Sequence, residues 1–441
     1  MNKHAFIRMG RWCALSAILA AVDHTASAAD GIFDRLNVGK NNSLTGNWSS
    51  IAGGSNNTVN ADYVTIGGGR DNSATGTRAF VGAGEDNQTT GTYAVIVGGY
   101  TNYQTDSYGF VGGGYGHLDK GSYGFIGGGY YNYLGSNTTG NTVPVANLVT
   151  GGAYNTNMVE FSAIVGGEGN LITNQFCFLG GGFENVAGGT YGGELSTGFH
   201  VLCGGYLNQI LADGWVVLGG GLGNIVRSSV GTLSGGGQND LHGLAATIAG
   251  GESNVITNGD DSTISGGNGN IVSATGAAIG GGTANSVSAS GGTVPGGANA
   301  SASHYGQQAY ASGGFTALGD AQSSLFVARA TTTNATATEL FLDGVGARMT
   351  IPTGQTWAYQ LLVSARCTNG NSGGWKFEGL IKNVSGTTSM VGTPLKTALA
   401  KDVTAWDVAL SATNSSLVIK GTGDTAKVRW VASVRTSEVS Q

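Results

Sequence analysis

The sequence predicts an all-β protein, in which a parallel β-roll or β-solenoid is followed by an antiparallel β-sandwich. A block of the form aliphatic, small, Gly, Gly, any, any, Asn recurs about every 15 residues, and a fixed period is typical of stacked repeats. Gly makes up 81 of the 441 residues and falls in pairs at every turn, which excludes helices. After residue 322 Gly thins out and apolar residues alternate with polar ones, which indicates a sandwich of about 120 residues.

The Asn of each block marks the register of the repeat. Seventeen copies run from Asn42 to Ala300, most of them 14 to 16 residues apart and two of them separated by 23. Glycine accepts positive φ, and Asn closes turns through its side-chain amide. We therefore expect stacked Asn side chains to form a hydrogen-bonded ladder. The turn ladder is expected at Asn57, Asn72, Asn87, Asn102, Asn132, Asn170 and Asn185.

The predicted core of the repeats is one dominant aliphatic row, six residues before each Asn. It runs from Leu36 to Val294, and Ser234 interrupts it when Asp240 is taken as the marker of that coil. A second, weaker apolar position lies two residues after the Asn. So thin a core buries little apolar surface relative to the entropic cost of ordering the chain. We infer that several chains pack together and share it.

The repeats between residues 36 and 300 resemble the head repeats of trimeric autotransporter adhesins, the YadA-like or Hep_Hag-type β-rolls. The resemblance rests on the apolar-x-Gly-Gly-x-x-Asn pattern and on the period, although the family's usual repeat is nearer 14 residues. Similar glycine-rich repeats occur in phage tail fibres. The resemblance implies three left-handed parallel β-rolls side by side, and hence a homotrimer.

The chain divides into four predicted segments. Residues 1–28 have a basic start, a short apolar run and the cleavage site Ala26-Ser27-Ala28, which predicts a secretory signal peptide. Residues 29–300 form the repeat rod, 301–322 a neck, and 323–441 the C-terminal sandwich. The last segment resembles C-terminal domains of phage tail-fibre-like and bacterial surface proteins. Removal of the signal predicts a secreted protein, either extracellular or held at a cell surface.

The charge of the mature chain is unevenly distributed. Residues 29–321 carry 6 Lys or Arg and 18 Asp or Glu, whereas residues 322–441 carry 11 and 7. An acidic rod has no face that neutralises phosphates, so we expect no nucleic-acid partner. The excess of four positive charges in the C-terminal segment suits an acidic glycan.

Aromatic residues form a second periodic feature, six residues after the Asn. Members of this strip include Tyr93, Tyr108 and Tyr123, and Arg78 interrupts it. Two interpretations are open: aromatic faces that stack on sugar rings, or a ladder that stabilises the edge of the solenoid. The candidate ligand-contact residues are Tyr93, Tyr108, Tyr123, Trp357 and Trp375.

The sequence contains no pattern that indicates a catalytic or metal-binding site. The densest acidic stretch, Glu160, Glu168, Glu184 and Glu194, is typical of a solvated face. The 15-residue period differs from the nine-residue calcium-binding repeat. We therefore predict no catalytic residue, no metal, no cofactor and no enzymatic activity.

The predicted function is that of a secreted, fibre-like adhesin, with the rod as spacer and the C-terminal domain as tip. Its partners would be copies of itself and a cell-surface glycan or protein receptor. Two alternatives stay open: a purely structural extracellular filament, and a β-helical enzyme that cleaves polysaccharide.

Overall fold

The computed structural model describes residues 35–135, 146–189 and 198–441, and within these ranges it is all-β, without a helix. The predicted signal peptide lies outside the described residues, as does most of the extra length of the two 23-residue intervals. No helix in the described ranges is long and apolar enough to cross a membrane. The chain divides into two compact units, Met1–Gly221 and Leu222–Gln441.

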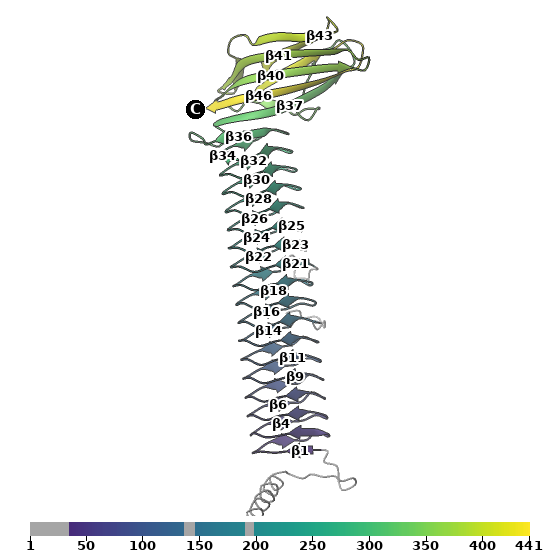
Figure 1. Ribbon diagram of the computed structural model, residues 1–441, viewed down its shortest axis with the longest axis vertical. Helices are drawn as coiled ribbons and strands as arrows, with labels where there is room; N and C mark the ends of the chain where they lie inside the picture. Colours follow the sequence, from purple (N-terminus) through teal and green to yellow (C-terminus); the bar gives the residue numbers. More distant parts are fainter. Residues whose placement is uncertain (1–34, 136–145, 190–197) are drawn as a thin grey trace, which may run out of the picture. The chain divides into compact units, whose positions relative to one another are not determined.

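The first unit is a parallel β-solenoid with two ladders of short strands (Figure 1). The first ladder consists of β1 (Arg35–Asn37), β3 (Ser49–Ile51), β5 (Thr65–Ile66), β7 (Phe80–Val81), β9 (Val95–Ile96), β11 (Phe110–Val111), β13 (Phe125–Ile126), β15 (Leu148–Val149), β17 (Ala163–Ile164), β19 (Phe178–Leu179), β21 (Gly198–Leu202) and β23 (Gly214–Leu218). The second consists of β2 (Ser43–Leu44), β4 (Thr58–Val59), β6 (Ser73–Ala74), β8 (Gln88–Thr89), β10 (Tyr103–Gln104), β12 (Leu118–Asp119), β14 (Tyr133–Leu134), β16 (Thr156–Asn157), β18 (Leu171–Ile172), β20 (Val186–Ala187) and β22 (Gln209–Ile210).

The second unit begins with further coils of the same kind. Its first ladder contains β25 (Val230–Leu233), β27 (Thr247–Ile248), β29 (Thr263–Ile264), β31 (Ala278–Ile279) and β33 (Thr293–Val294). Its second ladder contains β24 (Ile225–Val226), β26 (Asp240–Leu241), β28 (Val255–Ile256), β30 (Ile271–Val272), β32 (Ser286–Val287) and β35 (Ser301–Ala302). The predicted fold class, a β-solenoid of about 17 coils followed by antiparallel β-structure, is confirmed.

The aliphatic row lies inside the coils, because each strand pairs in register with the equivalent strand of the next coil. Ile51 pairs with Ile66, which pairs with Val81, and all three are fully buried. The row two residues after the Asn is also buried, and a third row of small residues, such as Val64 and Ala79, completes the interior. The core therefore has three rows and not the single dominant one that the sequence predicted.

Two register assignments from the sequence are wrong. Leu36 pairs with Ser50 and is exposed, so it lies on the outer side of the first ladder. The marker of one later coil is Asn239, whose side-chain nitrogen lies 3.0 Å from Asn224 Oδ1, and not Asp240. This shift of one residue places Leu233 in the aliphatic row, fully buried, so Ser234 does not interrupt it.

The marker Asn side chains form one column of hydrogen bonds in each unit. Asn72 Nδ2 lies 3.1 Å from Asn57 Oδ1 in the preceding coil, 3.1 Å from Gly68 O in its own turn and 2.9 Å from Gly84 O in the next coil. Its Oδ1 accepts from the Asn87 N–H at 3.1 Å. The structure places all seven residues predicted for the turn ladder in the column of the first unit.

His117 occupies one position of this column and performs the same role with a ring nitrogen. The backbone N–H of His117 donates to Asn102 Oδ1 at 3.0 Å, and its ring Nδ1 accepts from the backbone N–H of Asn132 at 3.1 Å. Burial lowers the pKa of the imidazole, which keeps Nδ1 free of a proton and able to accept. The column therefore continues through the substitution.

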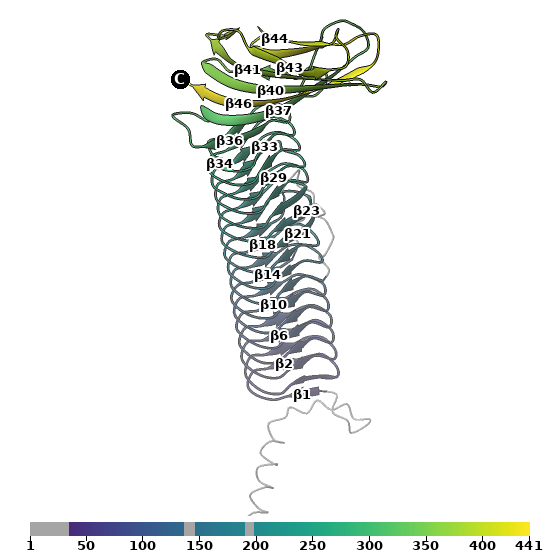
Figure 2. The ribbon, with the colours of Figure 1, turned by 45° about the horizontal axis from the view of Figure 1, so that its top comes forward.

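The second unit ends in two packed antiparallel sheets. Strand β34 (Gly297–Ala298) lies just before the predicted neck, which contains β35 and β36 (Gln308–Ser312). Strand β36 pairs in parallel with β33 and β34, and antiparallel with β37 (Ala321–Thr332), so it joins the coils to the larger sheet (Figure 2).

The larger sheet has the order β37, β46 (Val428–Ser440), β40 (Gln355–Cys367), β41 (Ser372–Val384) and β43 (Leu395–Lys401), with β42 (Thr387–Met390) also on β41. The smaller sheet pairs β45 (Ser416–Thr422) with β38 (Thr338–Glu339), β39 (Met349–Thr350) and β44 (Asp407–Thr413). Both sheets contribute to one apolar core that contains four buried Trp residues.

We expect Asn72→Ala to lower the free energy of unfolding by about 3 kcal/mol, because it leaves the Asn87 N–H without its acceptor and removes a donor from two Gly carbonyls. Chemical denaturation measures the change. Thr75→Ala, an exposed position of the same coil, serves as control and should cost little. Equal unfolding midpoints for the two variants would contradict a structural role for the column.

Candidate functional site

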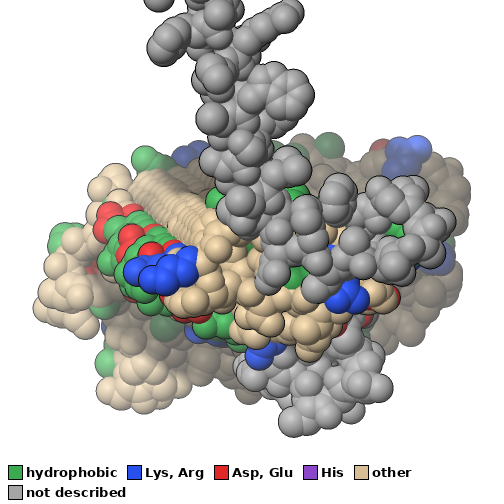
Figure 3. Space-filling model, turned by 90° about the horizontal axis from the view of Figure 1, so that it is seen from below, with side chains coloured by type: hydrophobic (Ala, Val, Ile, Leu, Met, Phe, Trp, Pro, Cys, Tyr) green, Lys and Arg blue, Asp and Glu red, His purple; other side chains and the backbone are tan. Residues whose placement is uncertain are grey.

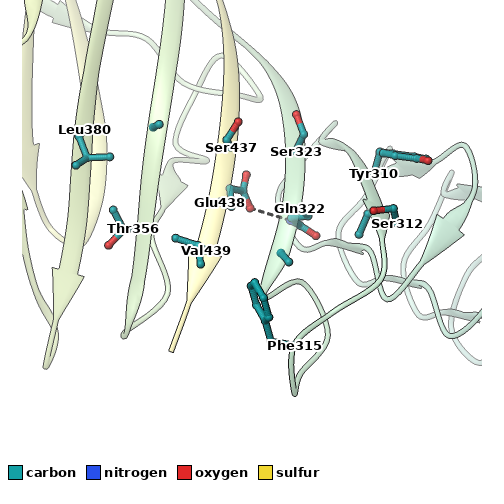
Figure 4. A pocket seen from close by; sticks show the side chains of 13 residues that line it. Tyr310, Ser312, Phe315, Gln322, Ser323, Thr356, Leu380, Ser437, Glu438 and Val439 are labelled. Atoms are coloured by element: carbon teal, nitrogen blue, oxygen red, sulfur yellow. Dashed lines mark hydrogen bonds between the residues drawn. The ribbon is translucent and has the colours of Figure 1, made fainter.

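A concave surface lies where the last coil meets the larger C-terminal sheet, within the second unit. A groove of ≈ 530 Å³ runs between β36 and the starts of β37 and β40 and the end of β46 (Figure 4). Its lining consists of Tyr310, Ala311, Ser312, Phe315, Ala321, Gln322, Ser323, Thr356, Ala358, Leu380, Ser437, Glu438 and Val439.

Two exposed aromatic rings belong to the groove. Tyr310 lies on β36 and is 53% exposed, and Phe315 lies on the following loop and is 71% exposed. The Asp320 carboxylate fixes this loop by accepting the N–H groups of Phe315 at 2.8 Å, Thr316 at 2.6 Å and Ala317 at 2.7 Å. These bonds lower the pKa of Asp320. The fold thus holds a large apolar ring in solvent on an ordered loop.

Polar groups line the groove opposite the aromatic rings. Glu438 is almost fully buried, accepts from Gln322 Nε2 at 2.8 Å and also accepts from the Thr436 hydroxyl. The hydroxyls of Ser312, Ser323, Thr356 and Ser437 lie around this pair in Figure 4. Aromatic faces beside hydroxyl and carboxylate oxygens provide the contacts that a sugar ring needs: an apolar surface for its C–H face and partners for its hydroxyls.

A second hollow of ≈ 470 Å³ adjoins the groove and shares Tyr310 and Ser323 with it. Arg435 lines this hollow from β46, where it lies opposite Leu325 of β37 and Gln360 of β40. The Gln360 amide donates to Glu378, which also forms an ion pair with Lys376. A cation therefore borders the aromatic groove without a neutralising carboxylate in the lining.

The aromatic strip of the coils forms stacked ladders. The rings of Tyr93 and Tyr108 are 5.0 Å apart and nearly parallel, and those of Tyr108 and Tyr123 are 4.8 Å apart. Arg78 lies between Tyr63 and Tyr93, with its guanidinium 5.4 and 5.1 Å from the two ring centres. Because each ring covers the face of its neighbour, these residues expose edges and hydroxyls, which favours the ladder interpretation over sugar stacking.

Trp357 and Trp375 are not available to a ligand, so the sequence-based prediction for them is wrong. Trp357 is 1% exposed and stacks on Phe326, and Trp375 is fully buried against Trp430. Both are on the inward side of their strands, because β40 and β41 alternate and the apolar side faces the second sheet. The groove aromatics Tyr310 and Phe315 were missed because the predicted neck carried no periodic signal.

A further surface was also missed, on the outer side of the first ladder in the first unit. The residue before each buried aliphatic points outward, and from β7 to β23 this row is apolar: Phe80, Val95, Phe110, Phe125, Leu148, Ala163, Phe178, Val201 and Val217. Phe80, Phe125 and Phe178 are about 40% exposed, and Val97 and Val165 lie beside the row. We call these positions the outer apolar row. Figure 3 looks along the coils and shows a band of hydrophobic side chains, with acidic side chains among them, along one edge.

The most perturbed carboxyl of the solenoid lies inside a coil and not in a groove. Asp119 is fully buried; its Oδ1 accepts from the Gly121 N–H at 2.9 Å, and its Oδ2 has no partner among the described residues. Burial raises the pKa of Asp119 to about 7. A Cβ at Gly124 would approach Asp119 Oδ1 to 2.4 Å, so a glycine beside it creates the room. Such a group cannot reach a polymeric substrate.

No group of three or more His, Cys, Asp or Glu side chains within the described ranges is arranged to hold a metal ion. The three cysteines of those ranges are free thiols. Cys177 and Cys367 are buried, and Cys203 is exposed beside the outer apolar row.

Comparison with known proteins gives a match only among solved structures. No protein-family model and no curated protein matches the sequence. A tailspike protein, gp49 of the Acinetobacter baumannii bacteriophage Fri1, a capsular polysaccharide depolymerase, matches at 10% identity and a TM-score of 0.23, over 92% of this chain and 81% of that one. The tailspike protein of Acinetobacter phage vB_ApiP_P1 matches at 10% identity and a TM-score of 0.21, over 92% and 80%.

This comparison corrects the prediction that the chain is not an enzyme. A named depolymerase is among the structures that align with nearly the whole chain, so a repetitive β-structure with few histidines does not exclude catalysis, and we withdraw that prediction. At these TM-scores the comparison does not assign an activity or a site to this chain.

Asp119 should make stability fall as pH rises. The folded carboxyl stays protonated up to about pH 7, whereas in the unfolded chain it ionises near pH 3.8. Between these values the unfolded state binds fewer protons, so folding loses about 4 kcal/mol by pH 8. We expect Asp119→Asn to match wild type at pH 4 and to be more stable at pH 8 in chemical denaturation. A difference that does not change with pH would contradict the assignment.

Proposed function

We propose that this protein is an extracellular, surface-associated protein that recognises glycans through the groove at Tyr310 and Phe315. The observation that carries the proposal is Phe315, a large apolar ring that is held 71% exposed by three hydrogen bonds to Asp320. An exposed aromatic ring that the fold fixes beside polar groups in a groove has the composition of a ligand site. The hydroxyls and the carboxylate around it provide specificity.

A second candidate function is cleavage of the bound glycan, and Glu438 is the observation that favours it. It is one of the residues that line the groove, and its carboxylate, on the inward side of β46, accepts from Gln322 and Thr436. Glycosidases act with carboxyl groups that flank the bond to be broken. The depolymerase among the matched structures acts on capsular polysaccharide, and this class of polymer is the first to test.

We also propose that the chain assembles with copies of itself, as a homotrimer, through the outer apolar row of the first unit. The described outward positions of that row from Ser50 to Val217 carry no charged residue, and the central ones carry Phe, Val and Leu. Contiguous apolar surface of this kind is rare on monomers. Three chains is the number that the resemblance of the repeats implies, and secretion follows from the predicted signal peptide.

Removal of the two groove rings should abolish glycan recognition. We expect the variant Tyr310→Ala with Phe315→Ala to lose at least tenfold in retention on an array of bacterial surface polysaccharides, because the stacking surface is gone while the core is unchanged. Tyr305→Ala removes an exposed ring of the same unit that lies outside the groove and is the matched control. Retention of the double variant at the wild-type level would refute the groove.

The same polysaccharides, incubated with wild type and with Glu438→Gln, decide between binding and cleavage. Release of new chain ends by wild type and its loss in the variant, with retention unchanged, would assign cleavage. Retention without release by wild type would leave recognition alone.

The outer apolar row should determine the oligomeric state. We expect Phe110→Lys with Phe125→Lys to convert the assembly to monomers, because two charges would have to be buried in an apolar contact. Light scattering after size-exclusion chromatography gives the mass. Gln88→Lys on the outer side of the second ladder should leave it unchanged, and a monomeric wild type would sink the proposal.

A further inference from the structure

A compact cationic pocket lies on the larger C-terminal sheet, at the end of β46 that begins with Val428. Its volume is ≈ 320 Å³, and its lining is Arg366, Cys367, Thr368, Gly370, Lys427 and Arg429. Half of these residues are cations, and none is acidic. We call the three cations the basic triad.

The register of the sheet places two of these cations directly against each other. Arg366 of β40 is the partner of Arg429 of β46 in the antiparallel pairing. Like charges at directly opposed positions destabilise a sheet. Among the described residues, Arg366 makes one side-chain hydrogen bond, which its guanidinium donates to Ser372 Oγ at 3.4 Å. The fold thus keeps an unfavourable pair at an exposed position where many residues would fit.

The other charges of this domain do not relieve the pair. Three cations of the domain form ion pairs, Arg348 with Glu339, Lys376 with Glu378 and Lys396 with Asp407. Arg329 and Lys401 donate to backbone carbonyls. Among the described residues, no carboxylate lies within 4.0 Å of a cationic nitrogen of the basic triad. Three of the cations without an ion pair therefore lie together in this pocket.

We propose that the basic triad binds the anionic group of an acidic sugar, a carboxylate or a sulfate ester. Two guanidinium groups present paired N–H donors that match the two oxygens of such a group. The Thr368 hydroxyl in the same lining offers a partner to a neighbouring sugar hydroxyl. This inference rests on the proposed function and makes it more specific, because it names acidic polysaccharide as the ligand class.

The path between the pocket and the aromatic groove supports a polymeric ligand. On the outer side of β37 the groove row begins at Ser323, opposite Ser437, and the pocket row lies at Thr331, opposite Arg429. Eight residues of strand span about 27 Å, the length of several sugars. The outward residues of β46 on this path are Arg429, Val431, Ser433, Arg435 and Ser437. None is acidic, and Arg435 provides a further cation near the groove end of the path.

The test compares two probes that differ in charge, trigalacturonate and galactotriose, by calorimetric titration of the full-length secreted protein. We expect wild type to bind trigalacturonate at least tenfold more tightly, and the preference to shrink at high salt. Arg366→Gln with Arg429→Gln should abolish it. Lys420→Gln, an exposed cation of the smaller sheet that lies outside the pocket and the groove, is the matched control and should change binding less than twofold. A 6-sulfated galactotriose identifies which oxyanion is preferred.

Several outcomes would overturn the proposal: equal binding of the charged and neutral probes, an unchanged preference in the arginine variant, or tighter binding of a single-stranded oligonucleotide than of either acidic sugar. Should the double variant fail to fold, Lys427→Gln, which is exposed and outside the opposed pair, replaces it and should lower the affinity at least threefold. Tyr310→Ala with Phe315→Ala separates the two hypotheses. Loss of neutral-sugar binding only in that variant supports the groove, and loss of the charge preference only in the arginine variant supports the pocket.

Discussion

The turn that contains the Asn column is the constraint on which the solenoid depends. Coils at strand spacing bring backbone against backbone, and at the turn there is no room for a side chain: a Cβ at Gly69 would lie 2.0 Å from Gly84 O. The carbonyls crowded there need donors, and in the described coils that carry the marker Asn its amide enters the turn and donates to carbonyls of its own and the next coil. The Gly pair and the Asn are thus both required by the same turn, and the sequence repeats with the period at which this turn recurs.

A second consequence of this turn is that every coil has the same inward and outward positions. Inside, substitutions are tolerated only when a neighbour compensates for volume: Gln104 and Asp119 are accommodated because Gly109 and Gly124 leave space beside them. Outside, a residue is repeated along the whole ladder without such a restriction. The same register that buries Val111 and Ile126 therefore aligns Phe110 and Phe125, 5.1 Å apart, on the surface. Packing inside the coil does not restrict the residues at outward positions, and in this chain those positions form aromatic ladders and the outer apolar row.

The sequence predicts these features to the extent that they are periodic. The buried aliphatic row and the Asn column follow from the spacing alone. Asp240 was mistaken for a marker because Asn239 precedes it and either residue fits a turn; only the hydrogen bond to Asn224 distinguishes them. Trp357 and Trp375 could not be assigned, because alternation along a strand gives two sides without saying which one a second sheet covers. The pairing of Arg366 with Arg429 depends on contacts between residues 63 apart in sequence, and no local pattern encodes it.

The C-terminal domain carries two surface features that lower its stability. Its core contains four Trp residues between two sheets, and neither the exposed Phe315 nor the opposed arginines belong to it. Both instead cost something: an apolar ring of this size in water, and two like charges in register. Binding of a ligand can offset the free-energy cost of an exposed ring and of opposed like charges. A polymer with apolar sugar faces and negative groups would cover the ring and neutralise the pair at once, and one chain of sugars along β46 reaches both.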